Sequence, residues 1–134
     1  MSLRSPLGRA RGLGSAKEGT SHWWAQRVTA IALVPLSLWF VIAMMSIVRA
    51  DYVTAIEWIG YPVNSTLLVV LIITAFYHGM LGMQVVIEDY VHHEGAKIAA
   101  LLITKFLLVL LGTAAVIAVL RIAFLSVLRL AFGS

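Results

Sequence analysis

The stretch "TLLVVLIITAFYHGMLGMQVVI", residues 66–87, decides the fold class of this chain. It is apolar along almost its whole length, and about 20 such residues in a helix are enough to cross a bilayer. Two further stretches, residues 28–48 and residues 98–120, are similarly long and apolar. The sequence therefore predicts an all-α membrane protein with three transmembrane helices.

The composition also points to lipid as the solvent of this chain. Of its 134 residues, 61% are hydrophobic and 12% are charged, whereas charged residues make up about a quarter of a soluble domain. The sequence contains no cysteine, which excludes disulfides, thiolate metal sites and cysteine nucleophiles. The net charge of +4 is concentrated near the N-terminus, so we interpret it as a topology signal and not as a nucleic-acid-binding surface.

Polar sequence precedes and separates the three predicted spans. We interpret residues 1–21 as a flexible basic cytoplasmic arm and residues 22–134 as a three-helix membrane region. Pro35 is expected to kink the first span, because its ring removes one backbone hydrogen bond. The links at residues 49–61 and 88–97 are short and polar.

The ends of the second and third spans carry different signals. Asn64, Ser65 and Thr66 are expected to cap the second helix, since their side chains can accept from free backbone N–H groups. The end of the third span is uncertain, because apolar sequence resumes after Arg121.

The distribution of basic residues predicts the orientation in the membrane. With three spans, the N-terminus and the second link share one side. That side carries Arg4, Arg9, Arg11, Lys17, Arg27 and Lys97, and the opposite side carries Arg49, Arg121 and Arg129. The positive-inside rule therefore predicts a cytoplasmic N-terminus.

His78 is the residue of the second span that most needs an explanation. It lies nine residues before residue 87, which places it roughly 13 Å inside the hydrocarbon. Ionisable groups at such depth are rare and face the protein interior. The imidazole could bind haem iron or form a hydrogen bond to a neighbouring helix. Gly79 and Gly82 leave room for a flat macrocycle or for a close helix, so the residues alone leave both roles open.

Asp89 and Tyr90 stand where the second span ends. Asp89 follows His78 by 11 residues, which at about 100° per residue returns it to nearly the same helix face. The Tyr90 hydroxyl could donate a hydrogen bond to a carbonyl group such as that of a quinone. The alternative is an ordinary interfacial tyrosine beside a helix-end carboxylate.

Arg27 precedes the first span, and His22 lies five residues before it. The Arg27 guanidinium could pair with a buried anionic group or act as a membrane anchor that reaches the interface. The sequence assigns no role to Lys105, and His92 and His93 are expected to be solvated.

The motif from His78 to Val91, "HGMLGMQVVIEDYV", resembles the second-span motif of the small hydrophobic membrane anchor of bacterial succinate dehydrogenase, respiratory complex II. The family pattern is a histidine, a Gly-Met pair, a Gln-Val segment and an Asp-Tyr-Val ending. These correspond here to His78, Gly82-Met83, Gln84 with Val85 or Val86, and Asp89-Tyr90-Val91. "RVTAIAL", residues 27–33, resembles the opening of the first span in this family, although position 28 is Val instead of Ala.

The resemblance implies specific roles for these residues. His78 would be one axial ligand of haem b, shared with a second three-helix anchor, cytochrome b556. Tyr90, supported by Asp89, would bind ubiquinone. Arg27 and His22 would lie near the haem propionates.

The resemblance also implies an assembly. A flavoprotein and an iron–sulfur subunit would dock on the cytoplasmic face of the bacterial inner membrane, where the complex oxidises succinate and reduces ubiquinone. This chain would hold no complete active site. The competing interpretation is a non-redox three-helix transport or assembly protein with His78 in a proton path. Membrane cytochromes of other dehydrogenases usually carry several deep histidines, and this chain has one.

Overall fold

The structure is a computed structural model that describes residues 17–132. Its helices in that range are α2 (Lys17–Ile47), α3 (Tyr52–Gly60), α4 (Pro62–Tyr90) and α5 (Glu94–Phe132). Three of them are long and apolar enough to cross a membrane, and the candidate spans are Thr20–Ile47, Pro62–Tyr90 and Glu94–Arg129. The expected all-α architecture with three membrane-crossing helices is therefore confirmed for this part of the chain. The side of the membrane that holds the N-terminus stays a prediction.

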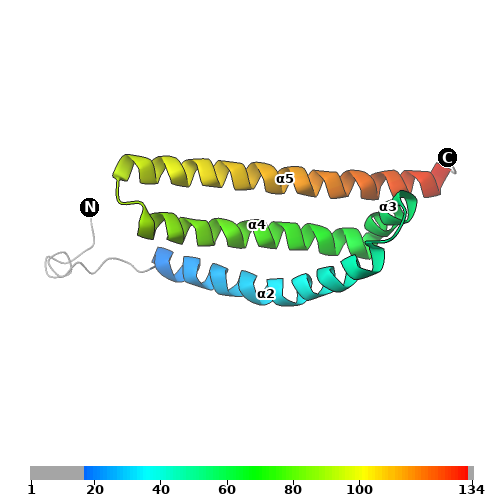
Figure 1. The fold of residues 1–134 in the computed structure, drawn as a ribbon, viewed down its shortest axis with the longest axis horizontal. Helices are drawn as coiled ribbons and strands as arrows, with labels where there is room; N and C mark the ends of the chain where they lie inside the picture. Colours follow the sequence, from blue (N-terminus) through cyan, green and yellow to red (C-terminus); the bar gives the residue numbers. More distant parts are fainter. Residues whose placement is uncertain (1–16, 133–134) are drawn as a thin grey trace, which may run out of the picture.

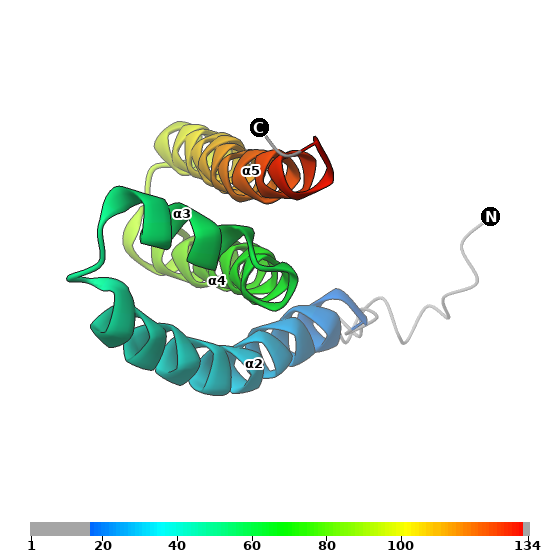
Figure 2. The same cartoon turned by 90° about the vertical axis from the view of Figure 1, so that its right-hand side faces the viewer.

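The long helix α4 lies at the centre of the bundle. It packs against α2 on one side and against α5 on the other, and Figure 2 shows it between these two helices. The short helix α3 packs against α5 and α4 at the end of the bundle where α4 begins (Figure 1). Every side chain on α4 that lies between its neighbours is therefore a candidate for the protein interior.

Helix α2 is continuous through Pro35. Both views show it bowed along its length, as expected for a helix with an internal proline (Figures 1 and 2). The helix begins at Lys17, so residues 17–21, which the sequence assigns to the arm, are helical. The rest of the predicted arm, residues 1–16, lies outside the described residues.

The predicted capping of α4 is wrong. The helix begins at Pro62, after Tyr61, because proline lacks an N–H and its fixed φ suits the first helical position. Ser65 and Thr66 instead donate from their hydroxyls to the Pro62 carbonyl at 3.1 and 2.7 Å. Asn64 donates from its side-chain amide to the Trp58 carbonyl at 2.8 Å. The predicted polar link before α4 also contains a helix, α3, that the sequence reading does not anticipate.

The register between α4 and α5 follows from a close contact at Gly112. A Cβ there would lie 3.3 Å from the Phe76 Cβ, so Gly112 and Phe76 lie at the same level of the two helices. Counting along the antiparallel helices from this contact, the predicted hydrocarbon edges at residues 87 and 66 lie level with about residues 101 and 122 of α5. Lys105 and Arg121 thus lie within about one turn of the two edges.

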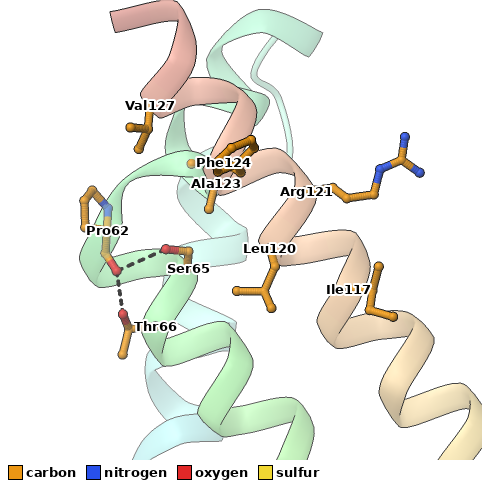
Figure 3. Close-up of a pocket in the computed structure, with 10 residues that line it drawn as sticks. Pro62, Ser65, Thr66, Ile117, Leu120, Arg121, Ala123, Phe124 and Val127 are labelled. Carbon is orange, nitrogen blue, oxygen red and sulfur yellow. Dashed lines mark hydrogen bonds between the residues drawn. The ribbon is translucent and has the colours of Figure 1, made fainter. Parts of the chain in front are cut away.

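Beyond Arg121, α5 continues to Phe132 alongside α3. The two helices are in direct contact, since a Cβ on Gly60 would overlap the Ser126 side chain. An apolar groove of about 690 Å³ lies at this end, between the start of α4 and this part of α5. Figure 3 shows Ser65 and Thr66 directed at the Pro62 carbonyl, while the Arg121 side chain extends away from them.

The outer surface of the bundle is apolar. Among the described residues, the buried ones are Gly60, Ser65, Leu68, Leu81 and Ile87, whereas many large hydrophobic side chains of α2, α4 and α5 are exposed. A soluble monomer rarely exposes apolar surface on this scale. The described residues thus form a bundle whose outside suits lipid or other membrane helices.

Candidate functional site at the contact of α2 and α4

His78 of α4 faces α2. Its Nδ1 lies 2.9 Å from the hydroxyl oxygen of Thr29, and its Nε2 lies 3.5 Å from the amide nitrogen of Gln26. The histidine is half-buried. The interhelical hydrogen bond that the sequence left open as one role of His78 is therefore present in the chain.

The hydrogen bonds of Thr29 assign the imidazole tautomer. The hydroxyl also lies 2.7 Å from the Ala25 carbonyl, a shorter contact than that to the Gln26 carbonyl at 3.1 Å. Because the hydroxyl has one proton, its donation to Ala25 makes its oxygen the acceptor for an N–H on His78 Nδ1. The Nε2 atom of His78 then carries the lone pair, the form in which a ring nitrogen can bind a metal.

The hydrogen bond from His78 Nδ1 to the Thr29 hydroxyl is typical of histidines that bind a metal. Such histidines usually donate their second ring N–H to an oxygen, which fixes the tautomer and the ring orientation. Within residues 17–132 no group of three or more His, Cys, Asp and Glu side chains could hold a metal ion by itself. A haem iron needs only axial donors from the protein, so a single oriented imidazole fits that group.

The two glycines near His78 differ in their surroundings. A Cβ on Gly79 would meet nothing within 4 Å, whereas a Cβ on Gly82 would lie 3.7 Å from the Gln26 amide nitrogen. Gly82 therefore makes room for a side chain of α2, and Gly79 is the glycine beside open space.

The Gln26 side chain occupies the space in front of His78 Nε2. At 3.5 Å its amide forms at most a weak hydrogen bond there, and its carbonyl oxygen is buried with no partner in the described part of the chain. A buried unpaired oxygen is costly, by about 1–3 kcal/mol. Gln26 would have to turn aside for a ligand on Nε2, and little holds it in place.

Arg27 and His22 lie on different sides of α2. The Arg27 side chain is exposed, and its guanidinium carbon lies 4.7 Å from the centre of the Trp23 ring. Such a contact stabilises the cation by about 0.5–1 kcal/mol at exposed sites. His22 instead faces α4, half-buried, and its Nε2 is buried with no partner among residues 17–132.

A cavity of about 560 Å³ adjoins His22. Its lining combines small and polar residues of α2 with apolar and polar residues of α4: Ser21, His22, Ala25, Tyr77, Leu81, Gln84, Val85 and Glu88. The Gln84 amide donates to a Glu88 carboxylate oxygen at 2.9 Å. The structure thus brings His22 next to two polar residues, Gln84 and Glu88, for which the sequence reading proposes no site.

Asp89 and Tyr90 lie at the C-terminal end of α4, and both side chains are exposed. Neither lines the cavity beside His22. The Tyr90 side chain is 78% exposed, so its hydroxyl is accessible from outside the chain. This position suits a donor to a molecule that approaches from the membrane or from a partner protein.

The remaining candidates are peripheral. Lys105, His92 and His93 are exposed. The Ala96 N–H points to His93 Nδ1 at 3.4 Å, at the start of α5. Nothing in these contacts gives the three side chains a chemical role.

The sequence reading misses Gln26 and Thr29, the two residues that contact His78. A signal for them is present, because His22, Gln26 and Thr29 recur at spacings of four and three and so share one helix face. A polar face on an apolar helix indicates the side that packs on another polar surface.

Comparison with known proteins places this geometry in a family. The family described as succinate dehydrogenase/fumarate reductase transmembrane subunit matches residues 1–128. A succinate dehydrogenase hydrophobic membrane anchor subunit of Rickettsia bellii is 38% identical over 117 residues, which cover 87% of this chain and 94% of that protein. The subunit of the same description from Paracoccus denitrificans is 32% identical over 98 residues, 73% of this chain and 75% of that protein. No solved structure matches. The chain therefore belongs to the hydrophobic membrane anchor subunits of succinate dehydrogenase, as the resemblance of the His78–Tyr90 motif predicts.

Proposed function

We propose that this membrane anchor supplies one axial ligand of haem b through His78 and part of a ubiquinone site through Tyr90 and Asp89. The observation that carries the proposal is the orientation of His78 by Thr29, which leaves the Nε2 lone pair available. Family membership supports the setting, a membrane anchor subunit of succinate dehydrogenase.

His78 would hold the iron of haem b through Nε2, and Thr29 would keep the ring in the required tautomer. When bound, haem b supplies a one-electron carrier in the membrane. Because no other histidine lies deep in a span of this chain, the second axial ligand would come from the partner anchor, cytochrome b556. Gly79 supports this arrangement, since the space beside it is open.

Arg27 would balance the negative charge of a haem propionate. Counting from the contact of His78 with Thr29, Arg27 lies about 3 Å from the level of His78 along α2. An exposed guanidinium at that depth can reach an anion outside the chain. It could donate two parallel N–H hydrogen bonds to a carboxylate. His22 would also lie near a propionate, although its imidazole faces the cavity beside Glu88.

Tyr90 would donate its hydroxyl proton in a hydrogen bond to a quinone carbonyl. The bond would strengthen as negative charge develops on that oxygen during reduction. Asp89, the adjacent carboxylate, would orient the hydroxyl or take part in proton movement. Electrons would reach the quinone from the iron–sulfur subunit, and this chain would not contact succinate.

We propose that the N-terminus is cytoplasmic and that the membrane is the bacterial inner membrane. Helix α2 begins at the end of the bundle where Tyr90 ends α4, and the basic residues Arg4, Arg9 and Arg11 precede α2 in the sequence. The flavoprotein and the iron–sulfur subunit would therefore dock at the end of the bundle that carries His22 and Tyr90. Membrane lipid and the cytochrome b556 anchor would cover the exposed apolar sides.

The comparisons decide between the function classes that the sequence leaves open. A chain of the succinate dehydrogenase anchor family is a subunit of that dehydrogenase. The transport or assembly interpretation therefore has no support, although a proton path beside His78 is a separate question.

The test is to express this chain alone and together with the cytochrome b556 anchor and to record absorbance and electron paramagnetic resonance spectra. We expect a low-spin, six-coordinate haem only in the pair, because this chain supplies one axial bond. A low-spin haem on this chain alone, or none in the pair, would contradict the proposal.

A further inference from the structure

The contact between α2 and α4 contains several polar side chains on the facing sides of the two helices. On α2 they are His22, Gln26 and Thr29, which face α4 along about two turns. On α4 they lie between Glu88, near the helix end, and His78. In a membrane helix pair, polar side chains on facing surfaces are costly unless they are bonded or hydrated.

Two buried polar atoms on this side of α2 lack a hydrogen-bond partner among residues 17–132, which indicates that water lies beside them. His22 Nε2 and Gln26 Oε1 are both buried and lack hydrogen-bond partners in the described chain. The two residues are one helical turn apart, and the cavity of about 560 Å³ lies beside the first. A cavity of this size with polar walls holds several water molecules, since each takes roughly 30 Å³ in the liquid. Water in the cavity would satisfy His22 Nε2, and Gln26 Oε1 lies one turn farther along α2, toward the level of His78.

Two ionisable side chains, one from each helix, line the cavity. His22 is half-buried at one wall, and Glu88 is exposed at the other and bonded to Gln84. The only other titratable side chain in the lining is Tyr77.

The other ionisable groups near this end lie outside the lining, and among them Asp89, His92 and His93 are exposed. Arg27 lies over the Trp23 ring and does not line the cavity. On α5, which packs against α4, Lys97 pairs with Glu94 at 3.8 Å. His22 and Glu88 are therefore the pair in the lining that an added charge beside His78 would influence.

We propose that the cavity is a water-filled inlet in which His22 and Glu88 form a proton-exchange site linked to the redox state of the haem. The site binds one proton from the aqueous phase when one electron arrives on the haem, and it releases that proton when the electron leaves. An N–H or O–H bond forms and breaks, and no other bond of the chain changes. The link to the haem rests on the proposed function, whereas the inlet itself does not.

The inlet is tested by thiol labelling, because the chain has no cysteine of its own. Val85 lines the cavity and Met83 does not, yet both lie on α4 with nearly equal exposure in the chain, 42% and 43%. We would introduce Val85→Cys or Met83→Cys, assemble the whole complex in nanodiscs and follow a water-soluble maleimide by the mass of this subunit. A thiol in water ionises and reacts readily, whereas one in an apolar setting does not, so Val85→Cys should react at least about tenfold faster. Equal rates, or faster reaction at Met83→Cys, would overturn the inlet.

The proton site is tested by the pH dependence of the haem midpoint potential in the assembled complex. The wild-type potential should fall as pH rises, because reduction is accompanied by proton binding. His22→Gln and Glu88→Gln should each flatten this dependence. Glu94→Gln, which removes an exposed carboxylate at the same end of the bundle, should leave it unchanged.

These outcomes separate the two proposals. A pH-independent wild-type potential, or the same slope in all variants, would overturn the proton site while leaving haem ligation intact. A complex without haem would overturn the proposed function, and the labelling rates would still decide the inlet.

Discussion

The two ends of the bundle differ in how their polar groups are satisfied. At the end where α3 packs, the hydroxyls of Ser65, Thr66 and Ser126 donate to carbonyls within their own helices. At the other end, His78 bonds across to α2, while His22 and Gln26 each leave a buried polar atom without a partner in the described chain. Polar groups satisfied inside their own helix serve packing. The buried atoms of His22 and Gln26 without a partner among residues 17–132 favour the other end as the place where a ligand or water would bind.

The largest expected effect tests whether the polar end is the haem end. His78→Leu in the assembled complex should remove or convert the low-spin haem signal, because leucine offers no nitrogen and leaves a position on iron open. The complex should still assemble, since apolar contacts hold membrane helices together and leucine suits that setting. The measurement is absorbance together with electron paramagnetic resonance, and not turnover. An unchanged bis-histidine spectrum would return His78 to a structural hydrogen-bonding role with Thr29.

The next effect concerns the quinone site at the same end. Tyr90→Phe removes one exposed hydroxyl, so assembly and haem content should be unchanged. Succinate-driven ubiquinone reduction should slow by roughly 10- to 100-fold, the value of a hydrogen bond to a developing charge. Succinate oxidation with an artificial electron acceptor is the internal control and should persist. Quinone reduction at the wild-type rate would make Tyr90 an interfacial residue only.

A third prediction tests whether the α3 end is a packing site. Gly60→Ala should destabilise the assembled anchor by about 1–3 kcal/mol, because the new Cβ overlaps the Ser126 side chain. Adding Ser126→Gly should restore stability, since both the oxygen and the Cβ that obstruct are then gone. The measurement is thermal unfolding of the purified complex. Gly79→Ala is the matched control, because a Cβ on Gly79 meets nothing within 4 Å in this chain, so it should not change the unfolding temperature. A loss of haem from the Gly79→Ala complex would show that a bound group fills the space beside Gly79.

The comparison of the two ends also shows what the sequence could and could not predict. The three long helices follow from apolar length alone, and the motif from His78 to Tyr90 was enough for the family. The start of α4 was not predictable from its capping residues, because Pro62 fits the first helical position better than Ser65 or Thr66 fit a cap. Helix α3 was missed because a short amphipathic helix with Tyr52 and Trp58 resembles an interfacial loop in composition.

Some features of the candidate site could also be predicted from the sequence, and others could not. The place of His78 within a long apolar helix follows from the sequence, and its depth in the membrane stays a prediction. Its contacts with Gln26 and Thr29 depend on the rotation of α2 about its own axis, which a hydropathy pattern does not fix. His22 and Arg27, which the family resemblance assigns to the same haem propionates, lie on different sides of α2. His22 lines the cavity beside α4, whereas Arg27 lies over the Trp23 ring.

A smaller effect is expected at Arg27, which is exposed and partly held by Trp23. If its guanidinium pairs with a propionate, Arg27→Leu should lower haem occupancy, because a charge-assisted partner of the propionate is lost. The haem potential should also change, because a positive charge is lost beside it. Topology should be unaffected, since Arg4, Arg9 and Arg11 remain. An unaltered potential and occupancy would leave Arg27 as a membrane anchor.

The smallest effect is expected at the opposite end, at the start of α3. The Asp51 carboxylate accepts a hydrogen bond from the Thr54 hydroxyl, and this bond holds the pKa of Asp51 below its ordinary value. A depressed folded-state pKa stabilises the fold above the unfolded value, near 3.9, and this contribution is lost as pH falls through the folded pKa. Asp51 and Asp89 are the two aspartates of the sequence, so ¹³C-aspartate labelling of this chain in an Asp89→Asn background reports the Asp51 carboxyl alone. In that background, Thr54→Val should raise the pKa of Asp51 toward its ordinary value. If Asp51 titrates identically in Thr54→Val, the carboxylate at this end is governed by solvent alone, and the hydrogen bond contributes nothing measurable.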